Sequence, residues 1–298
     1  KKRKVQKIDM KKRKVKNTYN IINGIVLLIA IFIFFQEYCG DIHLQKERDV
    51  LSFTILIAAV VFAHMIKAGR LYLALYGADI GWEKYHKVYC KVTPVSMIFP
   101  LKVGEFFRMY CYGKELKNGL KGIIIVLLDR FMDTLALISM VLAVWFVNGG
   151  RLSFVIYVLM LIVVCLLILY YVFPSIYSFW NHFLLSAKAT EKKIALLHFL
   201  DVLHTVYGEI SGVTRGRGIL LYALSVIAWG IELGSVVLIS GDRGIRDKNR
   251  VISQYLSSAL GIGYSIELRQ FVFCSVVLLI FSFSVFIFFL QYYLVRSR

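Results

Sequence analysis

Six long apolar blocks, separated by shorter polar stretches, organise this chain of 298 residues. Each block is long enough, or nearly so, to cross a bilayer core, which requires about 20 helical residues. The blocks are Ile21–Phe35, Val50–Ile66, Ile123–Val147, Leu152–Phe173, Ile219–Ser240 and Phe271–Val295. This pattern predicts an all-α polytopic membrane protein with about six spanning helices.

Two further stretches are apolar in part but interrupted by Gly, Pro and charged residues. They are Val92–Tyr112 and Val251–Arg269. Both are too short and too broken to span, so we expect two re-entrant segments, which enter the membrane and return to the same side. Their breaks give the candidate gating residues, which are Pro100, Gly104, Gly261, Gly263 and Glu267.

The order of elements is the same in both halves of the chain: span, span, broken segment, span. The first half is expected to begin inside the cell and the second outside, so the two broken segments would enter from opposite faces. Paired, interrupted segments at matching positions are typical of transporters whose site lies near the bilayer midplane. We therefore predict an inverted repeat.

Composition supports a membrane protein, because 59% of the residues are hydrophobic and only 18% are charged. Soluble domains average about 45–50% apolar and about 25% charged residues. The five Cys form no CxxC pair and no pattern with His, so we expect no metal site and no cofactor. We also expect no nucleic acid as a partner.

Positive charge is concentrated at the N-terminus, where residues 1–16 contain ten Lys or Arg and one Asp. A basic block before the first span favours a cytoplasmic N-terminus and contact with anionic headgroups. We expect a basic tail over residues 1–17 and one integral membrane domain over residues 18–298. Residues 174–217 should form a cytoplasmic amphipathic interval. The side of the basic loop 241–250 and a start at Met10 stay open.

Five ionisable residues fall where the chain should be in hydrocarbon. They are Glu105, Arg108, Asp129, Arg130 and Asp133. Left unpaired near the bilayer centre, they would cost about 12–17 kcal/mol, which exceeds the stability of most domains. They must therefore pair or face water. Two interpretations are compatible: a salt-bridge cluster that ties the broken segment to the next helix, and a polar site for an ionic ligand. A guanidinium suits a phosphate, which makes Arg108 and Arg130 candidate ligand contacts.

The motifs around these charges resemble a known family. Pro-x-x-x-Gly-Glu-x-x-Arg at residues 100–108 is followed by Asp-Arg-x-x-Asp at residues 129–133. Together they are similar to the membrane domain of the lysylphosphatidylglycerol synthase/flippase family, the flippase portion of the bacterial multiple peptide resistance factor. The family usually has Glu where Asp129 stands. The stretch Gly261–Arg269 resembles its late Gly-x-Gly…Glu element, with a longer spacing to Glu267.

The resemblance implies a lipid-handling protein of the plasma membrane, and a flippase for a charged lipid, such as an aminoacyl phospholipid or a polyprenyl-phosphate-linked sugar. Synthesis in this family belongs to a separate soluble domain, and no interval between the spans is long enough for one. We therefore expect this chain not to make lysyl-lipid, with no catalytic residues. Two alternatives stay open: a membrane-embedded transferase using a lipid-linked donor, and a non-catalytic partner of a cytoplasmic enzyme. A lipid-modifying enzyme and a second copy of the chain are the candidate protein partners.

Overall fold

The computed structural model describes residues 2–38, 50–78, 80–99, 103–148, 153–186, 190–239, 245–261 and 263–296. Within these ranges the chain forms ten helices and no strand. The helices are α1 (Lys2–Tyr38), α3 (Val50–Ala74), α4 (Trp82–Ile98), α5 (Gly104–Glu115), α6 (Gly119–Asn148), α7 (Phe154–Ser186), α8 (Glu191–Thr214), α9 (Gly218–Ile239), α10 (Ile245–Ala259) and α11 (Ile266–Arg296). The predicted all-α polytopic class is confirmed.

Five helices of the described chain are long and apolar enough to cross a membrane: α1, α3, α7, α9 and α11. They coincide with five of the six predicted spans. The sixth predicted span lies in α6, which is not among the five. Its first half carries Asp129, Arg130 and Asp133, so α6 depends on the surrounding helices to bury these charges.

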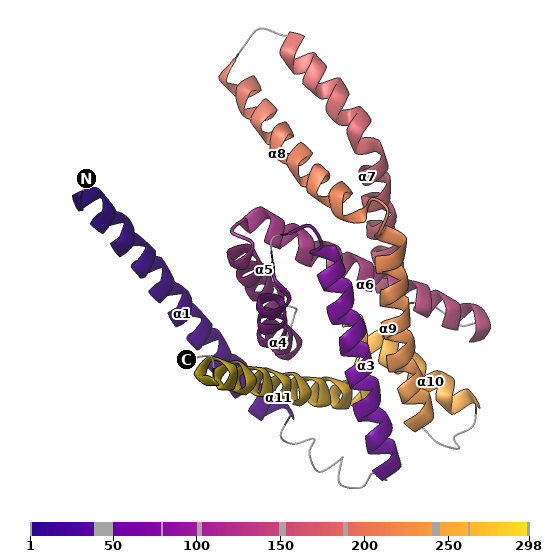
Figure 1. Cartoon of the computed structure of the whole chain (residues 1–298). Coiled ribbons are helices and arrows are strands. Elements are labelled where there is room, and N and C mark those ends of the chain that lie inside the picture. Colours follow the sequence, from indigo (N-terminus) through magenta and orange to yellow (C-terminus); the bar gives the residue numbers. More distant parts are fainter. Residues whose placement is uncertain are drawn as a thin grey trace.

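The segment Val92–Tyr112 is divided between two helices, as the sequence predicted, but α4 already begins at Trp82. α5 has 12 residues and is only about 18 Å long, too short to span. α4 and α5 pack side by side as a hairpin (Figure 1). Pro100, which falls between α4 and α5 in the sequence, lies outside the described residues. The entry of the hairpin into the membrane remains a prediction.

The second broken segment contains most of α10, which already begins at Ile245, then a turn and the first residues of α11. α11 starts at Ile266, five residues before the predicted start of the last span at Phe271. The turn uses Gly261 with φ +83°, a left-handed conformation that glycine adopts without steric cost. Of the loop 241–250, whose side was left open, residues 241–244 lie outside the described residues, and residues 245–250 form the start of α10.

Helix α7 is longer than predicted. It continues from Phe154 to Ser186 and includes Pro174, where we expected a polar interval to begin. The continuing run of apolar and aromatic residues explains the extension. α8 runs back beside α7 as a hairpin that projects from the rest of the protein (Figure 1). The ring of Tyr207 on α8 stacks on Phe173, and the Tyr170 hydroxyl lies 3.1 Å from the Thr214 hydroxyl.

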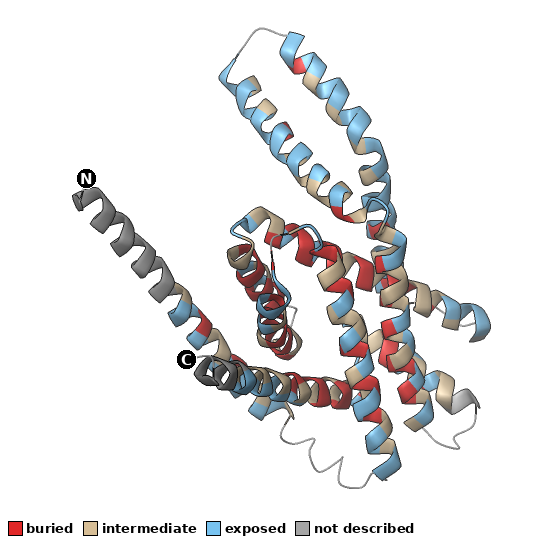
Figure 2. Ribbon diagram, viewed as in Figure 1, coloured by how far each residue is buried: buried red, intermediate tan, exposed pale blue. Residues whose placement is uncertain are grey.

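The two halves of the chain contact each other in a reciprocal pattern. The antiparallel helices α3 and α9, which occupy matching positions in the two halves, pack along each other (Figure 1). α4 of the first half packs on α11, and α10 of the second half packs on α6. Each broken segment thus contacts the last helix of the other half, while the inverted repeat itself stays a prediction. Most of the buried residues lie in the helices that form these contacts, while α7 and α8 are largely exposed (Figure 2).

Two glycines allow the helices around the broken segment to approach closely. A Cβ atom on Gly104 would lie 2.6 Å from the Cα atom of Ser96, which places α5 directly against the end of α4. A Cβ atom on Gly122 would clash with the backbone of Gly113, where α5 turns into α6. These contacts fix α5 between its neighbours and thereby position Glu105 and Arg108.

We predict that Gly122→Ala destabilises the protein by about 1–3 kcal/mol, the usual cost of overpacking. The matched control is Gly212→Ala in α8, where an added Cβ meets no atom within 4 Å. That control should be neutral or slightly stabilising, because Ala is the better helix former. Thermal unfolding of the purified variants measures both effects. Equal melting temperatures for the two variants would contradict the close contact of α5 with α6.

Candidate functional site

Asp129 lies at the centre of a buried ionic cluster formed by α3, α5 and α6. Its Oδ1 atom accepts a hydrogen bond from Nε of Arg70 at 3.0 Å, and its Oδ2 atom accepts one from Arg108 at 2.8 Å. All three side chains are almost completely buried. One carboxylate thus joins arginines from two different helices, which explains how α6 can hold this charge.

Arg70 is the residue that the sequence analysis missed. Arg70 lies beyond the end of the predicted span Val50–Ile66, but α3 continues to Ala74 and buries it. Besides Asp129, its guanidinium contacts Asp133 and donates to the hydroxyl of Ser225 on α9. The sequence did offer a signal for such a partner. Asp129 and Asp133 lie one helical turn apart, and two neighbouring buried acids are stabilised by a cation that both can contact.

The structure brings together all five of the predicted charged residues. Arg108 lies 3.4 Å from Glu105, and Arg130 lies 3.3 Å from the other oxygen of Glu105. Arg130 also approaches Asp129 at 3.7 Å and Asp133 at 3.6 Å. The side chain of Arg130 is 37% exposed, whereas that of Arg108 is 2% exposed. Arg130 is therefore the accessible cation of the cluster.

The charges of the cluster balance. Three arginines, at positions 70, 108 and 130, face three carboxylates, at positions 105, 129 and 133. Burial opposes the charge of the Arg108 guanidinium, and the carboxylates of Asp129 and Glu105 compensate for it. Removing any buried member would leave an uncompensated charge, so the cluster is a structural tie as well as a candidate site.

A second polar contact lies further along α3 and α9. Lys67 on α3 forms an ion pair with Glu232 on α9, and its ammonium lies 4.9 Å from the ring centre of Trp229. The hydroxyl of Tyr255 on α10 donates to the other oxygen of Glu232 at 3.0 Å. The sequence analysis also missed this group, although Glu232 is the only charged residue in the block Ile219–Ser240.

The late candidate residues lie apart from the cluster. Gly261 and Gly263 belong to the turn between α10 and α11, and Glu267 lies in the first turn of α11. Glu267 accepts a hydrogen bond from the hydroxyl of Ser265 at 2.8 Å. A gating role for these residues and for Gly104 stays a prediction. Among the described residues no group of three or more His, Cys, Asp or Glu side chains could hold a metal ion.

Comparison with known protein families matches residues 21–248 to the family described as the lysylphosphatidylglycerol synthase TM region. The match includes the whole ionic cluster and ends before Gly261. No curated protein matches the chain, and no solved structure does.

The cluster makes a prediction for Arg70. We expect Arg70→Met to destabilise the protein by about 3–5 kcal/mol, because it leaves two buried carboxylates without their shared partner. Arg130→Met should cost much less, since Arg130 is partly exposed and its ion-pair distances are longer. Thermal unfolding in one detergent compares the two variants. If Arg130→Met lost more thermal stability than Arg70→Met, a cluster centred on Asp129 and Arg70 would be contradicted.

The Lys67–Glu232 pair makes a second prediction. Lys67→Met should destabilise by about 3–5 kcal/mol, since it strands the buried Glu232 carboxylate, and Lys67→Met combined with Glu232→Leu should recover much of this loss. A double-mutant cycle on thermal stability measures the coupling. Additive effects of the two substitutions would mean that the two side chains do not pair.

Proposed function

Since the chain belongs to the lysylphosphatidylglycerol synthase TM region family, we propose that this multi-pass membrane protein is a flippase that moves a charged lipid across the plasma membrane. In this proposal the N-terminus is cytoplasmic, and the basic residues 1–17 contact anionic headgroups. Arg130 and the carboxylates around it receive the headgroup. The observation that carries the proposal is an accessible arginine within an otherwise buried and balanced ionic cluster.

The roles of the two predicted phosphate contacts differ in the proposal. Arg108 is buried and already engages Asp129 and Glu105, so it positions these carboxylates. Arg130 has three carboxylates within 3.3–3.7 Å and remains partly exposed. A lipid phosphate can replace such longer contacts with a two-pronged hydrogen bond to the guanidinium. Arg130 is therefore assigned to the phosphate, and Arg108 to the support of the site.

The charge balance of the cluster favours one class of headgroup. A purely anionic headgroup on Arg130 would add negative charge beside three carboxylates, which is unfavourable in a medium of low dielectric constant. A headgroup with both a phosphate and an ammonium group adds no net charge, because its ammonium can pair with Glu105 or Asp133 as its phosphate pairs with Arg130. This argument favours an aminoacyl phospholipid over a polyprenyl-phosphate-linked lipid.

The test is lipid translocation in liposomes that contain the purified protein. Fluorescent aminoacyl phospholipid, phosphatidylglycerol and polyprenyl-phosphate lipid are offered separately to the wild type and to Arg130→Ala. Loss of a charge-assisted hydrogen bond should reduce transport of the aminoacyl lipid by about 10–100-fold. The matched control is Lys121→Met on the same helix, whose only ion pair among the described residues is with Glu209 at 3.6 Å; it should transport normally.

Two other outcomes would contradict a flippase. A chemically altered lipid, detected by mass spectrometry, would favour a transferase acting on a lipid-linked donor. If the folded wild type neither moves nor alters any of the three lipids, a non-catalytic partner of a cytoplasmic enzyme becomes the better account. Transport of the polyprenyl-phosphate lipid alone would keep the flippase and overturn the preferred headgroup.

A further inference from the structure

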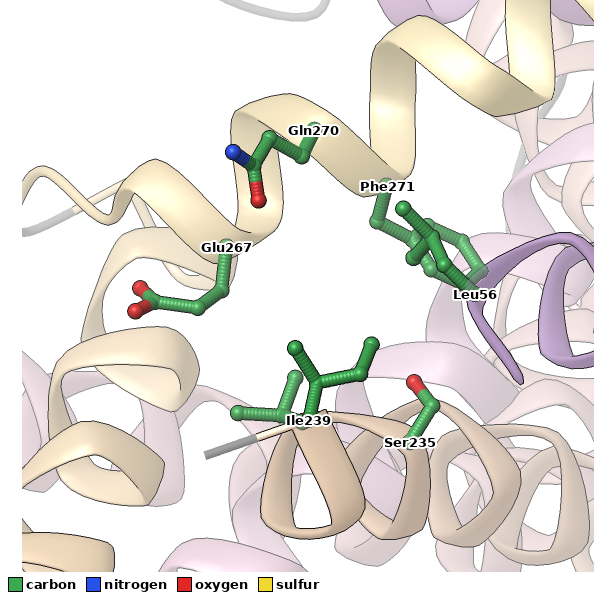
Figure 3. A pocket seen from close by; sticks show the side chains of 7 residues that line it. Leu56, Ser235, Ile239, Glu267, Gln270 and Phe271 are labelled. Carbon is green, nitrogen blue, oxygen red and sulfur yellow. The ribbon is translucent and has the colours of Figure 1, made fainter. Parts of the chain in front are cut away.

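A small cavity between α3, α9 and the first turns of α11 is not a second lipid site (Figure 3). It admits about one water molecule, and its lining is mostly apolar. Figure 3 shows the carboxylate of Glu267 directed away from Gln270 and Ser235, so these polar groups do not converge on one ligand. Basic groups that could hold a lipid headgroup outside the ionic cluster lie instead where α1 meets α4 and α5.

The ring of Tyr19 marks the junction of these three helices. Tyr19 is the first residue of the part of α1 that is apolar enough to cross a membrane, which ends at Tyr38. The centre of its ring lies 5.7 Å from that of Tyr110 on α5. One turn further along α1, the Asn23 side-chain oxygen accepts a hydrogen bond from the thiol of Cys111 on α5 at 3.9 Å. Since α1 also packs on α4, all three helices meet near this ring.

Two lysines from different helices lie against the Tyr19 ring. The ammonium group of Lys91 on α4 lies 5.1 Å from the ring centre, and that of Lys114 on α5 lies 2.9 Å from it. Lys91 also lies 5.5 Å from the ring centre of Phe107. Both lysines are partly buried. Because the two ammonium groups contact one ring, they are close enough for a single phosphate group to reach both.

The charge around this ring is positive. Within the described chain the ammonium group of Lys91 contacts aromatic rings and not a carboxylate. Glu115 supplies a favourable negative charge nearby, whereas Lys114 and Lys87 repel Lys91. Three lysines and one acid therefore leave an excess of positive charge. The cluster around Arg130, in contrast, is balanced.

Exposed apolar side chains adjoin the two lysines. Ile22 follows Tyr19 by one turn on α1 and is exposed. Phe106 and Tyr110 lie one turn apart on the same face of α5, and both are exposed. Tyr side chains are common where a membrane helix meets the headgroup region. A basic group beside an apolar surface of this kind fits a lipid, whose acyl chains cover the surface, better than a soluble phosphate.

We propose that Lys91 and Lys114 bind the phosphate of an acidic phospholipid at the junction of α1, α4 and α5. Basic pockets between membrane helices commonly hold anionic headgroups. A headgroup without an ammonium group is preferred, because it offsets the excess of positive charge. In this the site differs from the one proposed at Arg130, where charge balance favours a headgroup with both charges. Binding of this lipid does not depend on the proposed function.

A lipid at this junction would hold α1 against the hairpin of α4 and α5. Its phosphate would contact α4 through Lys91 and α5 through Lys114, beside the Tyr19 ring of α1. Phe107, which Lys91 contacts, directly precedes Arg108 of the ionic cluster. The bound lipid would therefore stabilise the position of the helix that carries Arg108.

The test is the thermal stability of the purified protein in dodecyl maltoside micelles that contain rising amounts of phosphatidylglycerol. Binding to the folded state predicts a saturable rise in melting temperature. Phosphatidylcholine with the same acyl chains carries a quaternary ammonium group and should act much more weakly. Glycerol phosphate, which has the phosphate but no acyl chains, should also act weakly.

Three variants locate the site. Lys91→Gln and Lys114→Gln should each raise the half-saturating concentration of phosphatidylglycerol by about tenfold or more, because each loses a charge-assisted hydrogen bond to the phosphate. The matched control is Lys87→Gln, which removes the same charge from an exposed residue of α4 one turn before Lys91. It should change this concentration by less than about twofold, since exposed charges are screened. If Lys114→Gln does not fold, the comparison of Lys91→Gln with Lys87→Gln decides.

Three results would overturn the inference. The first is equal stabilisation by phosphatidylglycerol and phosphatidylcholine. The second is a half-saturating concentration that Lys91→Gln leaves unchanged, or that Lys87→Gln raises as much. The third is glycerol phosphate acting as strongly as the lipid, which would make the group a site for a soluble anion. The proposed function fails separately: lipid movement without this binding contradicts only the acidic-lipid site, and this binding without lipid movement contradicts only the flippase.

Discussion

The structure depends on the pairing of Asp129 with two buried arginines. Arg70 comes from α3 and Arg108 from α5 in the broken segment, so one carboxylate on α6 joins three helices. Charges at this depth are tolerated only in pairs, because the bilayer offers no water to replace a missing partner. The ion pairs therefore hold the hairpin of α4 and α5 in place beside α3 and α6.

The close packing of the hairpin complements this ionic tie. Gly104 and Gly122 bring α5 against α4 and α6, and buried arginines need such short approaches to reach their partners. Arg130, one residue after Asp129, lies at the edge of this tie, 3.7 Å from Asp129, and its side chain stays partly exposed. The ionic cluster thus has two parts. The buried pairs of Asp129 maintain the fold, and Arg130 is the cation that can change partners.

The sequence predicted the class of fold and the meeting of Glu105, Arg108, Asp129, Arg130 and Asp133, because the cost of unpaired charge in hydrocarbon leaves few alternatives. It did not predict Arg70 or Glu232. Arg70 follows the apolar block of its helix, and only the continuation of α3 to Ala74 shows that it is buried. Glu232 was hidden within a strongly apolar block. The predicted end of this span at Phe173 was wrong, because apolar and aromatic residues continue beyond Pro174 and α7 extends to Ser186.

The central claim is that Arg130 exchanges its carboxylate partners for a lipid phosphate while Arg70 and Arg108 keep theirs. The most direct measurement is an experimental structure of the protein in lipid nanodiscs that contain an aminoacyl phospholipid. The account predicts a phosphate at the Arg130 guanidinium and an ammonium beside Glu105 or Asp133, with the pairs of Asp129 intact. A headgroup bound to Arg108 in place of Asp129, or no headgroup at the cluster, would contradict it.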